Sequence, residues 1–183
     1  AVLASRNNAD TTQGMTHAWL FTGPPGSGRS NAAIAFAAAL VCKEGGCSKC
    51  TDCMSTITGS HADVELIKTE GLSIKIDEVR ELISRASWAP SVANWRVVVI
   101  EDADRLTDSA ANALLKVIEE PGLRTVWLLC APTLTDVLPT IRSRCRHLSL
   151  RTPSTKAITN LLIDRDAIDP KVADFVARAS GGH

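Results

Sequence analysis

The feature that most constrains this chain of 183 residues is a glycine-rich stretch at 23–30. Its residues are Gly23, Pro24, Pro25, Gly26, Ser27, Gly28, Arg29 and Ser30. An apolar run at 18–23 leads into it and predicts a buried strand, while an alanine-rich run at 30–42 follows and predicts a helix. A loop between a strand and a helix cradles phosphate, because its backbone N–H groups and the positive end of the helix face the same point. The alternative, a tight Gly/Pro turn that binds nothing, leaves this flanking order unexplained.

The stretch fits the phosphate-binding pattern G-x-x-x-x-G-K-[S/T] except where Arg29 replaces the lysine. Lysine reaches the β- and γ-phosphates as a compact point charge, whereas a guanidinium is longer, planar and forked and does not reproduce that geometry. Ser30 occupies the position that binds Mg²⁺. We therefore predict a real phosphate loop. Whether it still binds ATP and Mg²⁺ stays open, and a degenerate loop that persists only as structure is an alternative.

Strands and helices are predicted to alternate after the loop. Apolar runs predict strands at 63–68, 95–104, 125–132 and 147–150. Helical periodicity predicts one helix at 76–88, with Asp77 placed to cap it, and a second from the capping Thr107 to a stop at Pro121. This alternation predicts an α/β fold in which helices cover both faces of a parallel sheet.

Two acidic residues stand at the end of the strand predicted around 95–104. Glu101 and Asp102 follow four apolar residues, where a phosphate site needs acids for Mg²⁺ and for the attacking water. The usual order is Asp then Glu, so the reversed order here lengthens one carboxylate arm and shortens the other. The acids either complete a weakened phosphate site or begin a solvated loop.

Four of the six cysteines crowd into the short segment 42–53, at positions Cys42, Cys47, Cys50 and Cys53. Four thiolates at the spacing C-x₄-C-x₂-C-x₂-C suit a closed tetrahedral Zn²⁺ site with a structural role. An iron–sulfur site of the ferredoxin type is an alternative, although its fourth cysteine should lie farther along the chain. Disulfides and free thiols are the remaining alternatives.

Charge and composition set further limits. Twenty basic residues balance twenty acidic ones, which gives no reason to expect autonomous binding to DNA or to a membrane surface. No apolar run approaches the roughly 20 residues of a membrane span. From Pro153 the sequence becomes all-helical, with runs at 154–166 and 169–182. We therefore expect a nucleotide-binding core at 1–152 and a truncated helical domain at 153–183, both cut from a longer protein.

Two further motifs resemble a known family. The runs at 97–122 and 138–148 look like the bacterial clamp loader, an AAA+ assembly of the DNA polymerase III holoenzyme. The most specific parts are Asn112–Pro121 and the triplet Ser143, Arg144 and Cys145, and the resemblance extends from Ala18 to the end of the chain. It implies an AAA+ P-loop sheet with flanking helices, a zinc-binding insertion, and the start of a small helical lid domain.

Two subunit types of this family share the layout. The gamma/tau subunits hydrolyse ATP, whereas the delta-prime subunit has eroded ATPase motifs and acts as a stator. Three departures favour the delta-prime type: Arg29, the reversed acids, and Ala131-Pro132 where a polar phosphate sensor is expected. Thr133 is the remaining candidate for that sensor. The delta-prime type implies that hydrolysis at the chain's own loop is weak or absent, and the gamma/tau type stays the alternative. A stand-alone P-loop phosphotransferase is a remote one, since it leaves the four cysteines unexplained.

The resemblance implies that Arg144 acts in trans as an arginine finger on the γ-phosphate bound by a neighbouring subunit. A guanidinium suits this role because it is always charged and forks onto phosphate oxygens. The alternative is a solvated arginine in a basic run. The implied partners are the gamma/tau and delta subunits, the sliding clamp, and primed DNA contacted through the assembly. The implied location is the bacterial cytoplasm, away from any membrane.

Overall fold

The computed structural model of this protein describes residues 16–69 and 71–180, so the expectations for residues 1–15 lie outside the described part. One sheet holds five strands in the order β2-β3-β4-β1-β5, and every neighbouring pair is parallel. The strands are β1 (Ala18–Thr22), β2 (Val64–Ile67), β3 (Arg96–Ile100), β4 (Thr125–Ala131) and β5 (Arg146–Ser149). All five were predicted, but β3 ends before the acids that the sequence had placed inside it.

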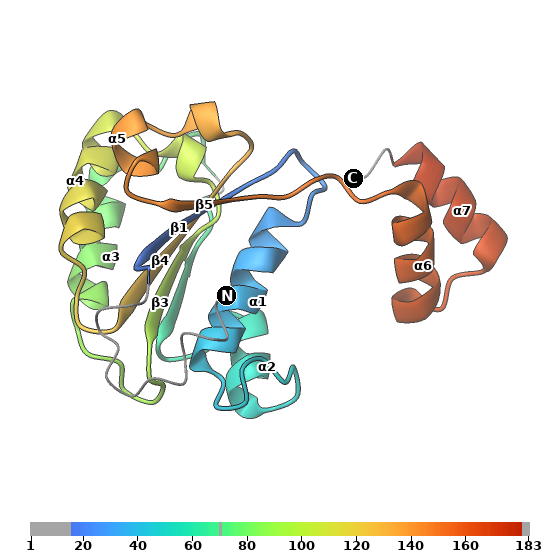
Figure 1. Ribbon diagram of the computed structural model, residues 1–183, viewed down its shortest axis with the longest axis horizontal. Helices are drawn as coiled ribbons and strands as arrows, with labels where there is room; N and C mark the ends of the chain where they lie inside the picture. The colour runs from blue at the N-terminus through green and yellow to red at the C-terminus, as the bar shows by residue number, and fades with distance from the viewer. Residues whose placement is uncertain (1–15, 70, 181–183) are drawn as a thin grey trace.

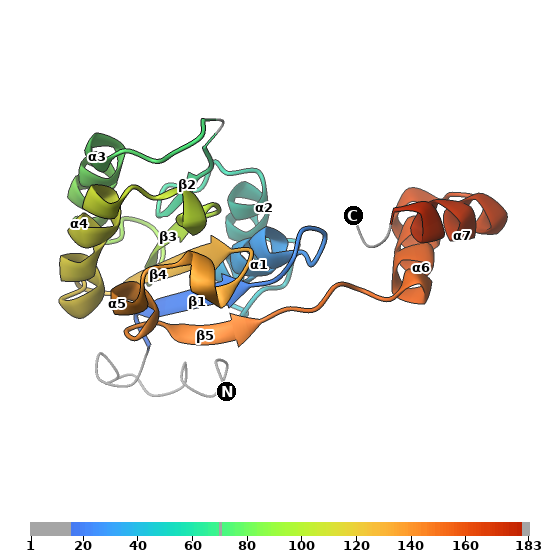
Figure 2. The same ribbon diagram turned by 90° about the horizontal axis from the view of Figure 1, so that it is seen from above.

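Helices cover both faces of the sheet, as predicted. Helix α1 (Arg29–Val41), with α2 (Thr51–Ile57) packed on it, lies against one face, and α3 (Ile76–Ala86) and α4 (Asp108–Glu119) lie against the other (Figures 1 and 2). Because alternate residues of a strand point to opposite faces, the sheet has two apolar cores. On β4, Trp127 and Leu129 belong to the core under α3 and α4, while Leu128 belongs to the core under α1.

The helix starts follow the sequence in one case and not in the other. Thr107 caps α4 as predicted, since its Oγ1 accepts the N–H of Ala110 at 3.3 Å. The prediction that Asp77 caps α3 is wrong. Asp77 lies in the first turn, and the backbone N–H of Lys75, the residue before the helix, donates to Oε1 of Glu78 at 3.0 Å. Helix α2 and the short helix α5 (Pro139–Arg142) were not predicted.

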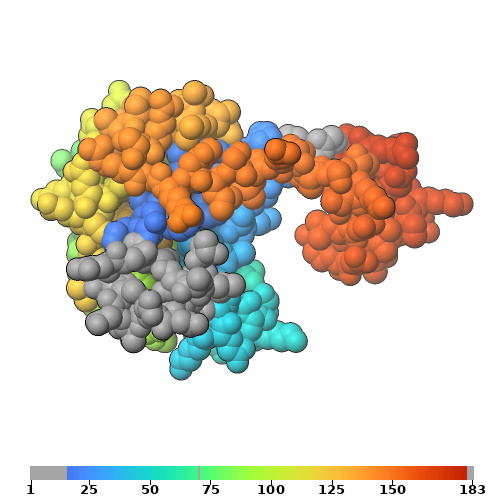
Figure 3. All heavy atoms as spheres, in the orientation of Figure 1, coloured from blue at the N-terminus to red at the C-terminus, as the bar shows by residue number. Residues whose placement is uncertain are grey.

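Two helices, α6 (Thr155–Asp166) and α7 (Pro170–Ala179), follow the sheet and pack against each other. Asp169 caps α7, because its Oδ1 accepts the N–H groups of Lys171 and Val172. Figures 1 and 3 show this pair beside the sheet, at the end of an extended segment that follows β5. The proposed domain boundary near residue 152 falls in that segment. Within the described residues, no helix is long and apolar enough to cross a membrane.

Candidate functional site

The phosphate loop follows β1 at the carboxyl edge of the sheet, beside the end of β4. The N–H of Gly23 donates to the carbonyl oxygens of Ala131 and Pro132, at 3.3 and 3.2 Å. A side chain at Gly23 has no room, because its Cβ would lie 2.8 Å from Cβ of Ser27 and 2.9 Å from the backbone oxygen of Leu150. Gly28 has φ 75°, in the left-handed region that glycine adopts without steric cost, and α1 begins at the next residue. The glycines at 23 and 28 are therefore required by the geometry of the loop.

Arg29 is turned toward its own loop. Its Nη1 donates to the carbonyl oxygen of Gly23 at 3.0 Å, and its Nε is buried without a hydrogen-bond partner in the described part of the chain. Oγ of Ser27 is likewise buried and unpartnered there. A phosphate-binding lysine extends its ammonium toward the β- and γ-phosphates. The guanidinium of Arg29 instead donates to a carbonyl oxygen of the loop itself. Two orphan polar atoms leave hydrogen-bonding capacity inside the loop.

Cys130 lies on β4 next to β1, and the pKa of its thiol is affected by the charges of Glu101, Asp102 and Arg29. Burial, and to a lesser extent the charges of Glu101 and Asp102, raise the pKa of Cys130 to about 12, while the charge of Arg29 acts against the shift. The Sγ atom also lies 3.9 Å from the backbone oxygen of Arg29. The fold therefore brings the reversed acid pair and the phosphate loop to the same edge of the sheet.

The end of β4, between the loop and the acids, carries no polar side chain. Ala131 ends the strand and Pro132 follows it. Thr133, the candidate phosphate sensor, is exposed; its Oγ1 lies 2.8 Å from Oγ1 of Thr135, and its N–H donates to Oδ2 of Asp136 at 2.9 Å. The hydroxyl of Thr133 therefore helps to form a turn in this structure.

The four clustered cysteines form a second centre, at the end of α1 away from the phosphate loop. The Sγ atoms of Cys42, Cys47, Cys50 and Cys53 all lie within 4.8 Å of one another, and no other described group of residues forms such a cluster. The Sγ atom of Cys42 lies 3.8 Å from that of Cys47 and 3.7 Å from that of Cys50. Tetrahedral Zn²⁺ with Zn–S bonds near 2.3 Å sets its sulfur atoms roughly 3.8 Å apart. None of these four described cysteines is in a disulfide, and their Sγ–Sγ distances fit a tetrahedral metal ion.

The thiols of this cysteine cluster differ in acidity. The N–H groups of Cys47 and Gly46 lower the pKa of Cys42 to about 6, whereas burial raises the pKa of Cys53 to about 12. A bound Zn²⁺ displaces the proton from each coordinating thiol. His61 is not a fifth ligand, because its Nδ1 accepts the N–H of Asp63 at 3.0 Å and its Nε2 lies 3.8 Å from Asp52.

Arg144 lies in the turn between α5 and β5, where its side chain is 40% exposed. Its Nε donates to Oε1 of Glu119, the last residue of α4, and its Nη1 donates to the carbonyl oxygen of Thr140 at 2.9 Å and to Oγ of Ser143 at 3.3 Å. The sequence assigned no role to Glu119. The available signal was an acid at the last residue of a helix, where the macrodipole disfavours negative charge.

Arg144 and the phosphate loop of the same chain lie at opposite ends of the parallel strands. The loop stands at their carboxyl ends, the carboxyl edge of the sheet, and Arg144 stands before the amino end of β5, at the opposite, amino edge. Strand β5 pairs in parallel with β1, from Arg146 opposite Trp19 to Ser149 opposite Thr22. Arg144 stands just before the first of these pairs, and the phosphate loop begins just after the last. The length of the paired strands, at roughly 3.3 Å per residue, therefore separates Arg144 from its own loop.

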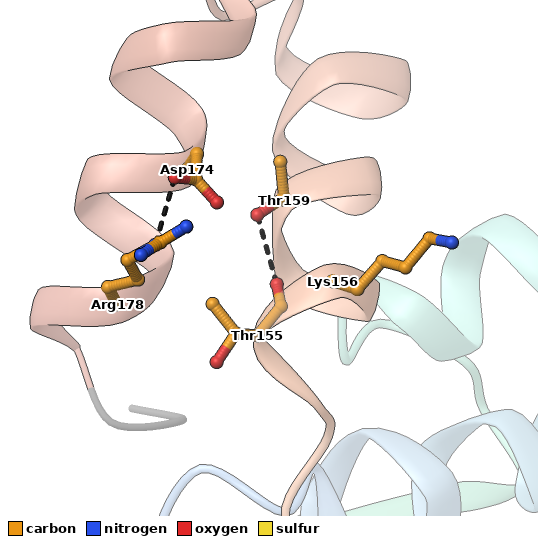
Figure 4. A pocket seen from close by; sticks show the side chains of 5 residues that line it. All are labelled: Thr155, Lys156, Thr159, Asp174 and Arg178. Carbon is orange, nitrogen blue, oxygen red and sulfur yellow. Dashed lines mark hydrogen bonds and ion pairs between the residues drawn. The ribbon is translucent and has the colours of Figure 1, made fainter.

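A hollow of about 390 Å³ lies between α6 and α7, away from both arginines. Figure 4 shows its lining residues, which are Thr155, Lys156, Thr159, Asp174 and Arg178. Arg178 faces Asp174, with 2.9 Å between Nε and Oδ2, so its charge is compensated within the hollow. Neither the acids nor the glycine-rich loop contributes to it.

The strand order, the phosphate loop after β1 and the acids after β3 define a P-loop α/β fold of the AAA+ class. A solved DNA polymerase III gamma subunit-related protein from Thermotoga maritima has the same fold. Its TM-score is 0.59 at 23% sequence identity, and the match covers 82% of this chain and 46% of that one. The predicted fold class is therefore confirmed.

Sequence similarity identifies the family. The family described as DNA polymerase III, delta subunit matches residues 2–154, and this chain belongs to it. DNA polymerase III subunit delta' of Bacillus subtilis is 36% identical over 166 residues, which cover 89% of this chain and 50% of that protein. DNA polymerase III subunit gamma/tau of Mycobacterium bovis is 32% identical over 178 residues, which cover 92% and 31%. The chain thus spans half, or less, of the length of these relatives.

Proposed function

We propose that this chain is the nucleotide-binding-type domain of a delta-prime-like clamp-loader subunit, which supplies Arg144 to the ATP site of a neighbouring subunit. Its own phosphate loop hydrolyses little or no ATP. Its partners are the gamma/tau and delta subunits, the sliding clamp, and primed DNA contacted through the assembly in the bacterial cytoplasm. Membership of the DNA polymerase III family supports the assembly, and the geometry of the two arginines supports the division of roles.

The observation that carries this proposal is the position of Arg144 relative to the phosphate loop of its own chain. The two lie at opposite edges of the sheet, and this separation supports a role for Arg144 on a nucleotide that another molecule holds. Its contacts with Glu119, Thr140 and Ser143 leave Nη2 without a partner among the described residues. A charged, half-exposed donor that stands apart from its own loop is what a finger in trans requires.

In the neighbouring site, water attacks the γ-phosphorus of ATP and the bond to the bridging oxygen of ADP breaks. Negative charge spreads over the oxygens of the transferred group, and a guanidinium stabilises that charge without exchanging a proton. The role of Arg144 is thus electrostatic.

The cysteine cluster takes no part in this chemistry. We propose that it holds structural Zn²⁺ through Cys42, Cys47, Cys50 and Cys53, because a site closed by four protein sulfurs leaves no position for substrate.

Hydrolysis at its own loop, as in a gamma/tau motor, is the second candidate. The loop keeps its glycine geometry, Glu101 and Asp102 reach the same edge, and a gamma/tau protein is among the relatives. Against it stand the contact of Arg29 with Gly23 and the absence of a polar side chain at the end of β4.

The test is Arg144→Ala in a clamp loader reconstituted from full-length subunits. We expect ATP turnover at the adjacent site to fall at least about tenfold, and up to roughly 10³-fold, because a finger of this kind contributes 10³ to 10⁵ in other phosphate-transferring systems. Arg80→Ala is the matched control, since Arg80 is also exposed and paired with an acid, at 3.5 Å from Asp77 on α3. Unchanged turnover in Arg144→Ala would contradict the finger role.

A further inference from the structure

The ion pair between Glu119 and Arg144 joins two elements that are far apart in the sequence. Glu119 is the last residue of α4, and Arg144 follows α5. Ile118, next to Glu119, and Ile141, three residues before Arg144, are buried in the same apolar core, at 6% and 1% exposure. Both ends of the ion pair therefore stand on a rigid part of the fold.

Stability alone gives little reason for this pair. The side chains of Glu119 and Arg144 are 47% and 40% exposed, and solvent-exposed ion pairs contribute little to folding free energy. A carboxylate at the last residue of α4 also faces the negative end of the helix, which is locally unfavourable. Glu119 thus stands where it does not stabilise the helix but where it accepts a hydrogen bond from Arg144.

The contacts of Arg144 fix the direction of its guanidinium. Glu119 accepts from Nε on one side, and Thr140 and Ser143 accept from Nη1 on another. Of the donor atoms, only Nη2 keeps its N–H groups unpaired within the described residues. Since the guanidinium is planar and its donors are rigidly spaced, holding Nε and Nη1 sets the orientation of Nη2.

We propose that Glu119 is the positioning residue for Arg144: it holds Nε so that Nη2 points toward the phosphate bound by the neighbouring subunit. This inference rests on the proposed function. An unrestrained arginine has many rotamers, and a reacting geometry lost by about 1 Å can cost roughly 10² in rate. The ion pair compensates part of the charge of Arg144 but fixes the orientation of its guanidinium.

The experiment uses the same reconstituted clamp loader and compares Glu119→Ala, Glu119→Gln and the control Glu120→Ala. Glu120 is the next residue, is also exposed, and makes no ion pair within the described part of the chain. We expect Glu119→Ala to lower kcat of the adjacent site about tenfold with KM unchanged, because transition-state contact and not ground-state binding is lost. Glu119→Gln keeps an acceptor oxygen at the same place, so it should recover part of that loss, and Glu120→Ala should change nothing.

A double-mutant cycle separates this inference from the proposed function. In an Arg144→Ala background, Glu119→Ala should have no further effect, because there is no guanidinium left to orient. If Arg144→Ala lowers turnover and Glu119→Ala does not, the positioning role is wrong while the finger role stands. If Arg144→Ala has no effect, the proposed function itself is wrong. A rise in turnover with Glu119→Ala would also overturn the inference, since it would mean that the acid restrains the finger.

Discussion

The two arginines at opposite edges of the sheet carry the same chemical group and use it differently. The guanidinium of Arg29 bonds a carbonyl oxygen of its own phosphate loop, with Nε buried. The guanidinium of Arg144 bonds Glu119 and Thr140 at the other edge and keeps Nη2 unpaired among the described residues. The cation of Arg29 is thus paired within its own loop, whereas the cation of Arg144 is half exposed. Under the proposed function, replacement of the phosphate-binding lysine weakens ATP hydrolysis at the chain's own loop and leaves the finger at the other edge intact.

A buried ion pair between Asp63 and Arg96 stands at the starts of β2 and β3, in the sheet that carries both arginines. Breaking this pair should have the largest effect. Asp63 is fully buried and accepts five hydrogen bonds, four from residues 91–93 and one from Nη2 of Arg96. Asp63→Asn should lower the free energy of unfolding by about 3 to 5 kcal/mol, because it leaves the charge of Arg96 buried and uncompensated. Urea unfolding measures this. Asp77→Asn, at an exposed acid, is the control, and equal stability of the two variants would contradict the prediction.

The same carboxylate predicts a pH dependence. Burial alone would raise the pKa of Asp63, but the N–H groups of Ser91, Ala93 and Val92 and the hydroxyl of Ser91 outweigh it and lower the pKa to about 2. A carboxylate whose pKa is lower in the folded state stabilises the fold above its ordinary pKa near 3.9, and loses that contribution as the pH falls toward 2. Unfolding measured between pH 5 and pH 2 should show this loss in the native protein and not in Asp63→Asn.

Removal of the proposed Zn²⁺ should affect the edge of Arg29 more than the edge of Arg144. The cysteine cluster closes the end of α1, the helix that begins at Arg29, and Gly46 backs onto this helix so closely that a Cβ there would lie 3.2 Å from that of Ala39. With Zn²⁺ at 100 to 1,000 times its Kd, its removal should cost about 3 to 4 kcal/mol. Chelation followed by urea unfolding measures this, and zinc analysis should give one ion per chain. A chain that binds no Zn²⁺, or whose stability ignores the chelator, would rule out the structural zinc.

Arg144→Lys sharpens the comparison by keeping the charge and removing the fork. Lysine cannot donate to Glu119 and Thr140 while also presenting a planar donor to phosphate. We expect turnover at the adjacent site to fall about 10²-fold, close to the loss that removal of one transition-state donor causes in other enzymes. Steady-state ATPase of the assembly, with Arg80→Lys as the control, provides the measurement. Full activity of Arg144→Lys would mean that a point charge is sufficient and that orientation by Glu119 is unimportant.

The sequence predicted the sheet better than it predicted side-chain contacts, for a physical reason. Apolar runs such as 97–100 and 125–131 have one low-energy fate in a parallel sheet, and they became buried strands. The acids after 100 and the capping of α3 depended on local competition among polar groups, and there the sequence placed the end of β3 and the cap at Asp77 wrongly. The pairing of Glu119 with Arg144 joins residues 25 positions apart, so no local pattern reveals it. Only the fold brings those two residues together.

Arg29→Lys is the smallest expected effect and tests whether the inward-facing arginine can be turned into a phosphate ligand. A lysine cannot reproduce the planar contact with Gly23, and its ammonium is free to extend toward the β- and γ-phosphates. One added charge-assisted hydrogen bond should tighten Mg–ATP binding by the full-length protein about tenfold, which calorimetry measures directly. Arg29→Gln, which removes the charge, controls for mere loss of the Gly23 contact and should not gain affinity. Binding by the native protein as tight as that of Arg29→Lys would show that Arg29 already serves phosphate, and the contrast between the two edges would then lie in hydrolysis and not in binding.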